Sequence, residues 1–306
     1  GQNLMENIYE LYTTEQLESV HNSDMYTMFY AIMGNQLIEE LGLDGESALR
    51  EATRRYGKDR GTYRRMRHLD ANLKINMKNL FSIGSDLPPD PRFERDLRRL
   101  TPEDRTCHTL RCPMAEIWKQ EGYGYVGRLY CEEFHPACYS SYAFGYTKVG
   151  LAKTLTQEGD EYCSFHIVLR PESLPEELKP ICFEQYDPVY TGQSHEIPRP
   201  SAKTGFNFLT VRVYYYMVEV CFERFGEAAF PVICHGLEKT ADYCSKYLIA
   251  AAKAMNRHLD AAFAEANFPL YQDPDQDPLW NQYNKVCAKD LLKQSFYPRF
   301  KEALGV

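Results

Sequence analysis

Residues 163–170, with the sequence CSFHIVLR, decide the fold because they repeat with the two-residue period of a β-strand. In an extended chain the side chains of Cys163, Phe165, Ile167 and Leu169 fall on one face. The preceding QEGD has the composition of a tight turn. Residues 125–134 (YVGRLYCEEF) and 146–155 (YTKVGLAKTL) also have strand character. We therefore predict an antiparallel sheet in the middle of the chain.

Helical patterns lie on both sides of this section. Residues 23–42 carry apolar residues at helical spacing, with Gly42 as a stop signal, and a second helix restarts at Asp44. A short helix is expected from Pro113, because proline suits the first helical position. A further helical block begins near residue 207.

The expected fold class is α+β, with a central antiparallel sheet flanked by N-terminal and C-terminal helical blocks. We predict one composite domain over residues 1–306. Its expected parts are a helical block, a section with the sheet and a short helix, a connection and a C-terminal helical block, at residues 1–100, 101–170, 171–206 and 207–306.

Composition excludes several classes of function. The net charge of −8 argues against general attraction to nucleic acid or to an anionic membrane surface. No apolar run approaches the ~20 residues that span a bilayer. The ten cysteines include no CxxC pair and are irregularly spaced, which favours reduced thiols in a cytoplasm. A cytoplasmic protein that binds a small molecule is expected, and a homo-oligomer is compatible with the sequence.

The stretch YCEEFHPAC, residues 130–138, gathers candidates for chemistry. If it is a strand, Cys131, Glu133 and His135 stand on one face, ~6–7 Å apart. That arrangement suits general acid–base chemistry or part of a metal site. An equally ordinary reading is a half-exposed strand with a buried cysteine and solvated glutamates.

Two thiols compete as nucleophiles. Cys131 has the acidic neighbour Glu132, which raises a thiol pKa. Cys112 precedes Pro113 at a predicted helix start and follows Arg111, and both features favour a thiolate. The chain contains no Walker loop, GxGxxG, GxSxG or HExxH motif, and no spacing typical of a zinc site. We therefore predict neither a metal nor another cofactor.

Four stretches together resemble the L-2-amino-thiazoline-4-carboxylic acid hydrolase family. They are GESALREATRRYGKDRG, RCPMAEIWKQEG, LYCEEFHPA and AKTLTQEGDEYCSFHIV, and the likeness covers about residues 24–170. The resemblance implies hydrolytic opening of a small cyclic amidine acid. By position, Cys112, Cys131, Asp160 and Cys163 fall on the family's recurrent Cys and Gly-Asp positions.

The leading hypothesis is therefore a hydrolase that acts on a C–N or C=N bond of a small carboxylated heterocycle. Glu133 is the predicted general base, with His135 or Tyr130 as the proton donor. Cys131 contributes as a nucleophile or a ligand, and Glu132 is an alternative acidic residue.

Binding of the substrate carboxylate is assigned to a cation. Arg111 or Arg60 is expected to pair with it bidentately.

The alternative function is a non-enzymatic sensor, because GDEYCSF is similar to 4-vinyl-reductase-type domains. The positions that carry Glu and Cys upstream of Cys163 in those domains are Ala152 and Leu155 here, which argues against zinc held in that manner.

Overall fold

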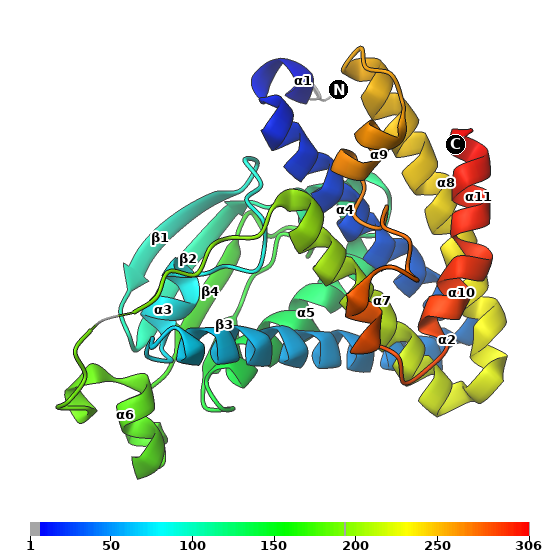
Figure 1. Cartoon of the computed structure of the whole chain (residues 1–306). Helices are drawn as coiled ribbons and strands as arrows, with labels where there is room; N and C mark the ends of the chain where they lie inside the picture. The colour runs from blue at the N-terminus through cyan, green and yellow to red at the C-terminus, as the bar shows by residue number, and fades with distance from the viewer. Residues whose placement is uncertain (1–6, 193, 306) are drawn as a thin grey trace. The chain divides into compact units, whose positions relative to one another are not determined.

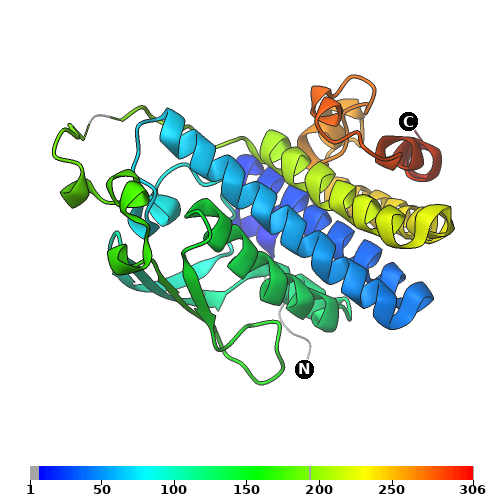
Figure 2. The same cartoon turned by 90° about the horizontal axis from the view of Figure 1, so that it is seen from below.

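The computed structural model describes residues 7–192 and 194–305. The chain divides into two compact units (Figures 1 and 2). Unit 1 contains residues 1–49, 88–91 and 201–306, and unit 2 contains residues 50–87 and 92–200. The fold is α+β with an antiparallel sheet from the middle of the chain, as predicted. The expectation of a single composite domain stays a prediction.

Unit 2 contains the sheet. Its strands follow the order β1-β2-β4-β3, and every neighbouring pair is antiparallel. The strands are β1 (Glu94–Leu100), β2 (Asp104–Arg111), β3 (Lys148–Leu151) and β4 (Cys163–Val168). The helices are the second part of α2 (Thr14–Asp70), α3 (Met77–Ser82), α4 (Pro113–Gln120), α5 (Gly124–Tyr142) and α6 (Lys179–Cys182), with three 3-10 turns at Pro171–Ser173, Glu176–Leu178 and Glu184–Tyr186.

Unit 1 is helical in its described residues. Its elements are α1 (Ile8–Leu11), the first part of α2, α7 (Ala202–Phe225), α8 (Phe230–Ala254), α9 (Ala261–Asn267), α10 (Ala288–Ser295), α11 (Tyr297–Leu304) and 3-10 turns at Gly226–Ala229 and Pro278–Asn281. Gly236 of α8 lies so close to Met33 of α2 that a Cβ added to Gly236 would be 2.8 Å from the sulfur of Met33. Phe268 stacks on Phe300, with ring centroids 4.5 Å apart.

Several local predictions are confirmed. β4 forms where the two-residue alternation is cleanest. Pro113 opens α4, and Gly122 adopts a positive φ of 82° just past its end. Gly42 ends the first helical part of α2, with a non-helical φ of 61° and ψ of −136°, and the second part restarts just beyond it, as predicted.

The strand predicted for residues 125–134 is wrong, because these residues belong to helix α5. The larger pattern is a buried stripe at four-residue spacing, formed by Val126, Tyr130, Phe134, Cys138 and Tyr142. Within the ten residues around Cys131, a two-residue alternation also fits the sequence by coincidence. The four-residue spacing becomes visible only over the full length of the helix. Pro136 lies within the helix, although proline usually interrupts one.

β1 lies inside the block predicted to be helical. Its sequence ERDLRRL is mostly charged, and its side chains are largely exposed. An edge strand pairs on one side only and needs little apolar surface, so the hydrophobic pattern did not reveal it.

Two glycines of α2 let α5 approach very closely. A Cβ at Gly61 would lie 2.1 Å from the carbonyl oxygen of Cys138, and one at Gly57 would lie 2.9 Å from that of Phe134. Neither carbonyl can move without moving the α5 backbone. The contact therefore fixes both the separation of these helices and the rotation of α5 about its own axis.

We expect Gly61→Ala to lower the free energy of unfolding by about 1–3 kcal/mol, because the added methyl group has no space beside Cys138. Urea denaturation measures this. Lys58→Ala, at an exposed position of the same helix, is the control and should stay close to the wild type. An unchanged stability in Gly61→Ala would contradict the close approach of α2 and α5.

Candidate functional site

Helix α5 separates the residues that a strand would have aligned. Cys131 and His135 are four residues apart and share a helical face. Glu133 is two residues from each and is therefore rotated by roughly 200° around the axis. The predicted row of Cys131, Glu133 and His135 on one face is thus wrong, and the candidate residues fall on two sides of the helix.

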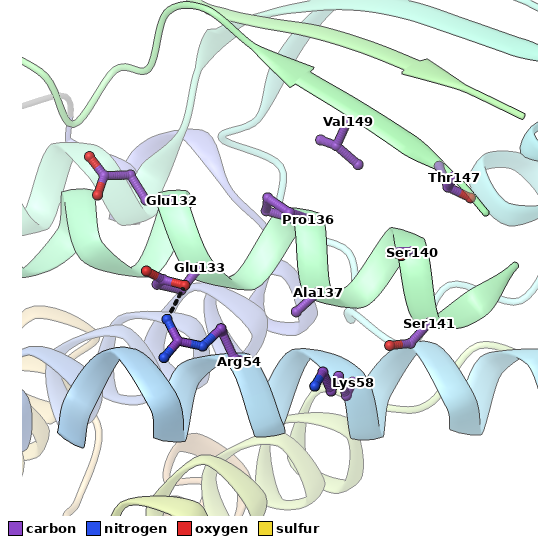
Figure 3. Close-up of a pocket in the computed structure, with 10 residues that line it drawn as sticks. All are labelled: Arg54, Lys58, Glu132, Glu133, Pro136, Ala137, Ser140, Ser141, Thr147 and Val149. Carbon is purple, nitrogen blue, oxygen red and sulfur yellow. Dashed lines mark hydrogen bonds and ion pairs between the residues drawn. The ribbon is translucent and has the colours of Figure 1, made fainter. Parts of the chain in front are cut away.

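On one side, Glu132 and Glu133 form ion pairs with α2. Arg50 contacts Glu132 at 2.8 Å and Glu133 at 3.1 Å. Arg54 contacts Glu133 at 2.8 Å (Figure 3). Arg128 adds a 2.7 Å contact to Glu132. Hydrogen bonds from Arg50 and Arg128 outweigh partial burial and lower the pKa of Glu132. Both carboxylates are thus held in ion pairs with arginines of α2.

A groove of about 340 Å³ opens beside these ion pairs (Figure 3). It runs between α2, α5 and the start of β3. It is lined by Arg54, Lys58, Glu132, Glu133, Pro136, Ala137, Ser140, Ser141, Thr147 and Val149. Its polar groups could bind a ligand, but the thiols and histidine of α5 do not line it.

On the other side, α5 faces the sheet. His135 meets Phe165 of β4 edge to face, with ring centroids 5.0 Å apart. The inward face of β2 carries Arg105, Cys107 and Thr109, which pair across the ladder with Ile167, Phe165 and Cys163 of β4. We call this region the α5–sheet layer.

Three of the predicted cysteines gather in the α5–sheet layer. Cys112 is the N-cap of α4, Cys131 lies on α5 and Cys163 begins β4. They lie near enough for Cys112 and Cys163 both to raise the pKa of the Cys131 thiol, after the larger effect of burial. The hydroxyl of Thr156 also hydrogen-bonds to Cys131.

The loop before β4 brings Thr156 to this place. The Oδ2 atom of Asp160 accepts a hydrogen bond from the backbone N–H of Thr154 at 3.0 Å. The sulfur of Cys163 accepts one from the N–H of Leu155 at 3.2 Å. Gly159 supplies the positive φ of 86° that turns the chain. Asp160 and Cys163 thus shape the loop that brings the hydroxyl of Thr156 within hydrogen-bonding distance of Cys131.

The prediction of an easily ionised Cys112 is wrong. Burial raises the pKa of its thiol to about 11, and the backbone N–H groups of Ala115 and Met114 compensate only in part. Arg111 does not supply the charge, because its guanidinium binds Glu116 at 2.8 Å. Burial also raises the pKa of Cys131 and of Cys163. These thiols are protonated at neutral pH.

His135 is the titratable group at the centre of the layer. Burial, followed by the charges of Arg60, Arg105 and Arg95, lowers its pKa to about 3. Its Nδ1 atom lies 3.1 Å from the hydroxyl of Tyr139, whose pKa burial raises to about 12. The pair is therefore a neutral imidazole beside a protonated phenol, and both side chains remain partly exposed.

The predicted carboxylate-binding arginines are engaged elsewhere. Arg60 forms a buried bidentate pair with Asp86, at 2.8 and 2.9 Å, and stacks over Phe134. The hydroxyl of Tyr130 accepts a long 3.5 Å hydrogen bond from it, and the Tyr130 ring stacks on Phe134 with centroids 5.0 Å apart. Tyr130 and Arg60 therefore support the packing of α5.

The sequence analysis missed Arg105, Thr156 and Tyr139. A signal for Arg105 was present, since DRTCHTLR alternates and places an arginine on the buried face with Cys107. Tyr139 lies four residues after His135, which becomes informative only once the segment is known to be helical.

Across residues 7–192 and 194–305, no group of three or more His, Cys, Asp or Glu side chains is arranged to hold a metal ion. No helix in the described chain is long and apolar enough to cross a membrane.

Comparison with known proteins finds a match to one family model over a little under half of the chain. The model of the L-2-amino-thiazoline-4-carboxylic acid hydrolase family matches residues 22–167, which confirms the resemblance. No curated protein and no solved structure matches the chain. The matched region contains every residue of the α5–sheet layer discussed above.

We expect Cys112 and Cys131 to resist alkylation at pH 7. A pKa of about 11 for Cys112 leaves about 10²-fold less thiolate than an ordinary thiol. Iodoacetamide labelling followed by mass spectrometry measures the rate at each site, with the urea-unfolded protein as the control. Preferential labelling of native Cys112 near neutral pH would restore the original prediction.

We expect His135 to make the protein less stable in acid. The unfolded chain binds a proton on this histidine below pH ~6.5, whereas the folded state binds it only near pH 3. Stability should therefore fall as the pH drops through this window, by about 1.4 kcal/mol per pH unit for one histidine. Urea denaturation at several pH values should show a smaller loss for His135→Gln. Equal slopes would contradict the lowered pKa.

Proposed function

We propose, from the match of residues 22–167 to the L-2-amino-thiazoline-4-carboxylic acid hydrolase family, that the chain hydrolyses a small carboxylated heterocycle of the cyclic amidine type. One observation carries the location of the site. Cys112, Cys131 and Cys163 converge in the α5–sheet layer although they belong to α4, α5 and β4, and Asp160 shapes the loop beside them. By the resemblance, these four residues fall on the family's recurrent Cys and Gly-Asp positions.

The chemistry of hydrolysis requires a proton acceptor for water. As the water oxygen bonds to the amidine carbon, one proton leaves the water and the ring nitrogen of the C=N bond gains one. A ring heteroatom then leaves with a proton, and the ring opens. His135 suits the first transfer because its imidazole is neutral and partly exposed. A hydrogen bond from the Nδ1–H of His135 to the hydroxyl oxygen of Tyr139 selects the tautomer in which Nε2 is free to accept the proton.

A pKa near 3 makes His135 a weak base in the free protein. Three arginines contribute to that low value, so an anionic substrate in the layer would offset their charge and strengthen the base. The protonated thiol of Cys131 and the hydroxyl of Thr156 supply hydrogen bonds to the reacting ring. This proposal replaces Glu133 by His135 as the proton acceptor, because Glu133 is paired with Arg50 and Arg54.

A panel of cyclic amidines, lactams and thiazolines, led by 2-amino-thiazoline-4-carboxylate, tests the function. Product formation is followed by liquid chromatography and mass spectrometry. We expect turnover of a carboxylated cyclic amidine. Binding without turnover of any compound would instead favour the sensor function.

Two substitutions on opposite faces of α5 test the site. His135→Gln should lower kcat by roughly 10²–10⁴-fold, the range typical of a missing general base. Glu133→Gln, the matched variant on the groove side, should stay within a few-fold of the wild type. The reverse result would move the reaction to the groove and to the residue predicted from the sequence.

A further inference from the structure

Arg105 of β2 is a buried cation for which the described residues supply no acceptor. Its side chain is 9% exposed, and its guanidinium lies 4.0 Å from the ring centroid of Phe81 and 6.0 Å from that of Phe165. Among the residues that the structure describes, no oxygen accepts a hydrogen bond from this guanidinium and no carboxylate pairs with it. Burying an unpaired charge is costly, so a missing counter-charge is the simplest explanation.

Other buried cations of unit 2 show how the fold treats such groups. Arg60 is paired with Asp86. Arg64 donates to the carbonyl oxygens of Leu80 and Ile83, at 2.5 and 3.2 Å. Lys74 is paired with Asp187 at 2.5 Å. Arg105 differs because its guanidinium lies over the ring of Phe81, with the Phe165 ring further away, while its N–H groups have no partner in the described chain.

A second arginine points to the same layer. Arg95 of β1 is opposite Thr109 in the ladder, and Thr109 shares the inward face of β2 with Arg105. Arg95 is exposed and stacks on Phe93 at 4.1 Å, and no described carboxylate pairs with it. Its charge lowers the pKa of Arg105 after the larger effect of burial, so the two cations are close enough to repel each other. An anion between them would remove this repulsion.

We propose that Arg105, assisted by Arg95, binds the carboxylate of the substrate on the inward face of the sheet, next to His135 and Tyr139. This inference rests on the proposed function and names what holds the acid group. A guanidinium that lies over an aromatic ring presents its N–H edge, which matches the two oxygens of a carboxylate. Arg105 replaces Arg60 and Arg111, which are bound to Asp86 and Glu116.

The position of the anion links binding to chemistry. Arg105 and Arg95 are two of the three charges that lower the pKa of His135, and Arg60 is the third. A carboxylate bound to Arg105 neutralises part of this field and makes His135 a better proton acceptor. The heterocycle then lies beside the imidazole, so an uncharged analogue should both bind weakly and react slowly.

Isothermal titration with two matched ligands tests the site without relying on turnover. The ligands are 2-amino-thiazoline-4-carboxylate and its 4-carboxamide, which lacks the negative charge, and each protein carries His135→Gln so that hydrolysis does not consume the acid during the titration. We expect Arg105→Gln to weaken binding of the acid by at least about tenfold and to leave binding of the amide unchanged. Arg95→Gln should have a smaller effect. Arg98→Gln, at an exposed position of β1 paired with Asp96, is the control and should match the His135→Gln parent.

The stability of the variants provides a second readout. Removing an unpaired buried charge should leave the melting temperature of Arg105→Gln unchanged or raise it, whereas loss of a structural arginine would lower it. If Arg105→Gln does not fold, Arg105→Lys and Arg95→Gln carry the binding test. Equal affinity of the His135→Gln parent and the folded variants for the acid overturns the proposal, as does an equal loss of affinity for both ligands.

Failure of this inference is distinguishable from failure of the proposed function. If the acid binds in a manner that depends on Arg105 but no product forms, the anion site stands and the hydrolase function falls. If the wild type and Arg105→Gln hydrolyse the acid at the same rate, the function stands and the assignment of Arg105 is wrong.

Discussion

The close approach of α2 and α5 at Gly57 and Gly61 determines the arrangement of everything else in the candidate site. A helix can pack on a neighbour in many rotational settings, but backbone contact at two consecutive turns leaves only one. With that setting, Cys131, His135 and Tyr139 are directed to the sheet, and Glu132 and Glu133 to the arginines of α2. The separation of the neutral α5–sheet layer from the charged groove thus follows from the two glycines of α2, which have no side chain.

Burial then determines the protonation states in the α5–sheet layer. Low polarity disfavours every charged form, so the thiols and the phenol keep their protons and the imidazole stays neutral. Arginine is the exception because its pKa is too high for burial to discharge it. A layer of neutral hydrogen-bonding groups therefore surrounds a permanent cation, and an anion that enters changes the properties of its neighbours.

The sequence was sufficient for the fold class but not for the geometry of the site. The alternation of residues 163–168 and the proline at position 113 are local signals, and both predicted the correct element. The segment around Cys131 failed because its helical stripe extends from Val126 to Tyr142, beyond the stretch that contains the reactive residues. The family resemblance pointed to Cys112, Cys131, Asp160 and Cys163, but their convergence depends on contacts between distant elements that no local pattern contains.

Arg105 shows why a buried charge can escape sequence analysis. Its neighbours in the chain, Asp104 and Thr106, point to the other face of the sheet, where Asp104 contacts His166 at 3.1 Å. Although Asp104 is adjacent in sequence, the alternation of the strand places it on the face opposite Arg105. Natural folds rarely keep a charge in this condition unless another property depends on it, because replacing it with an uncharged residue costs little or stabilises the protein. The energetic cost of Arg105 is thus a further argument for the proposed anion site.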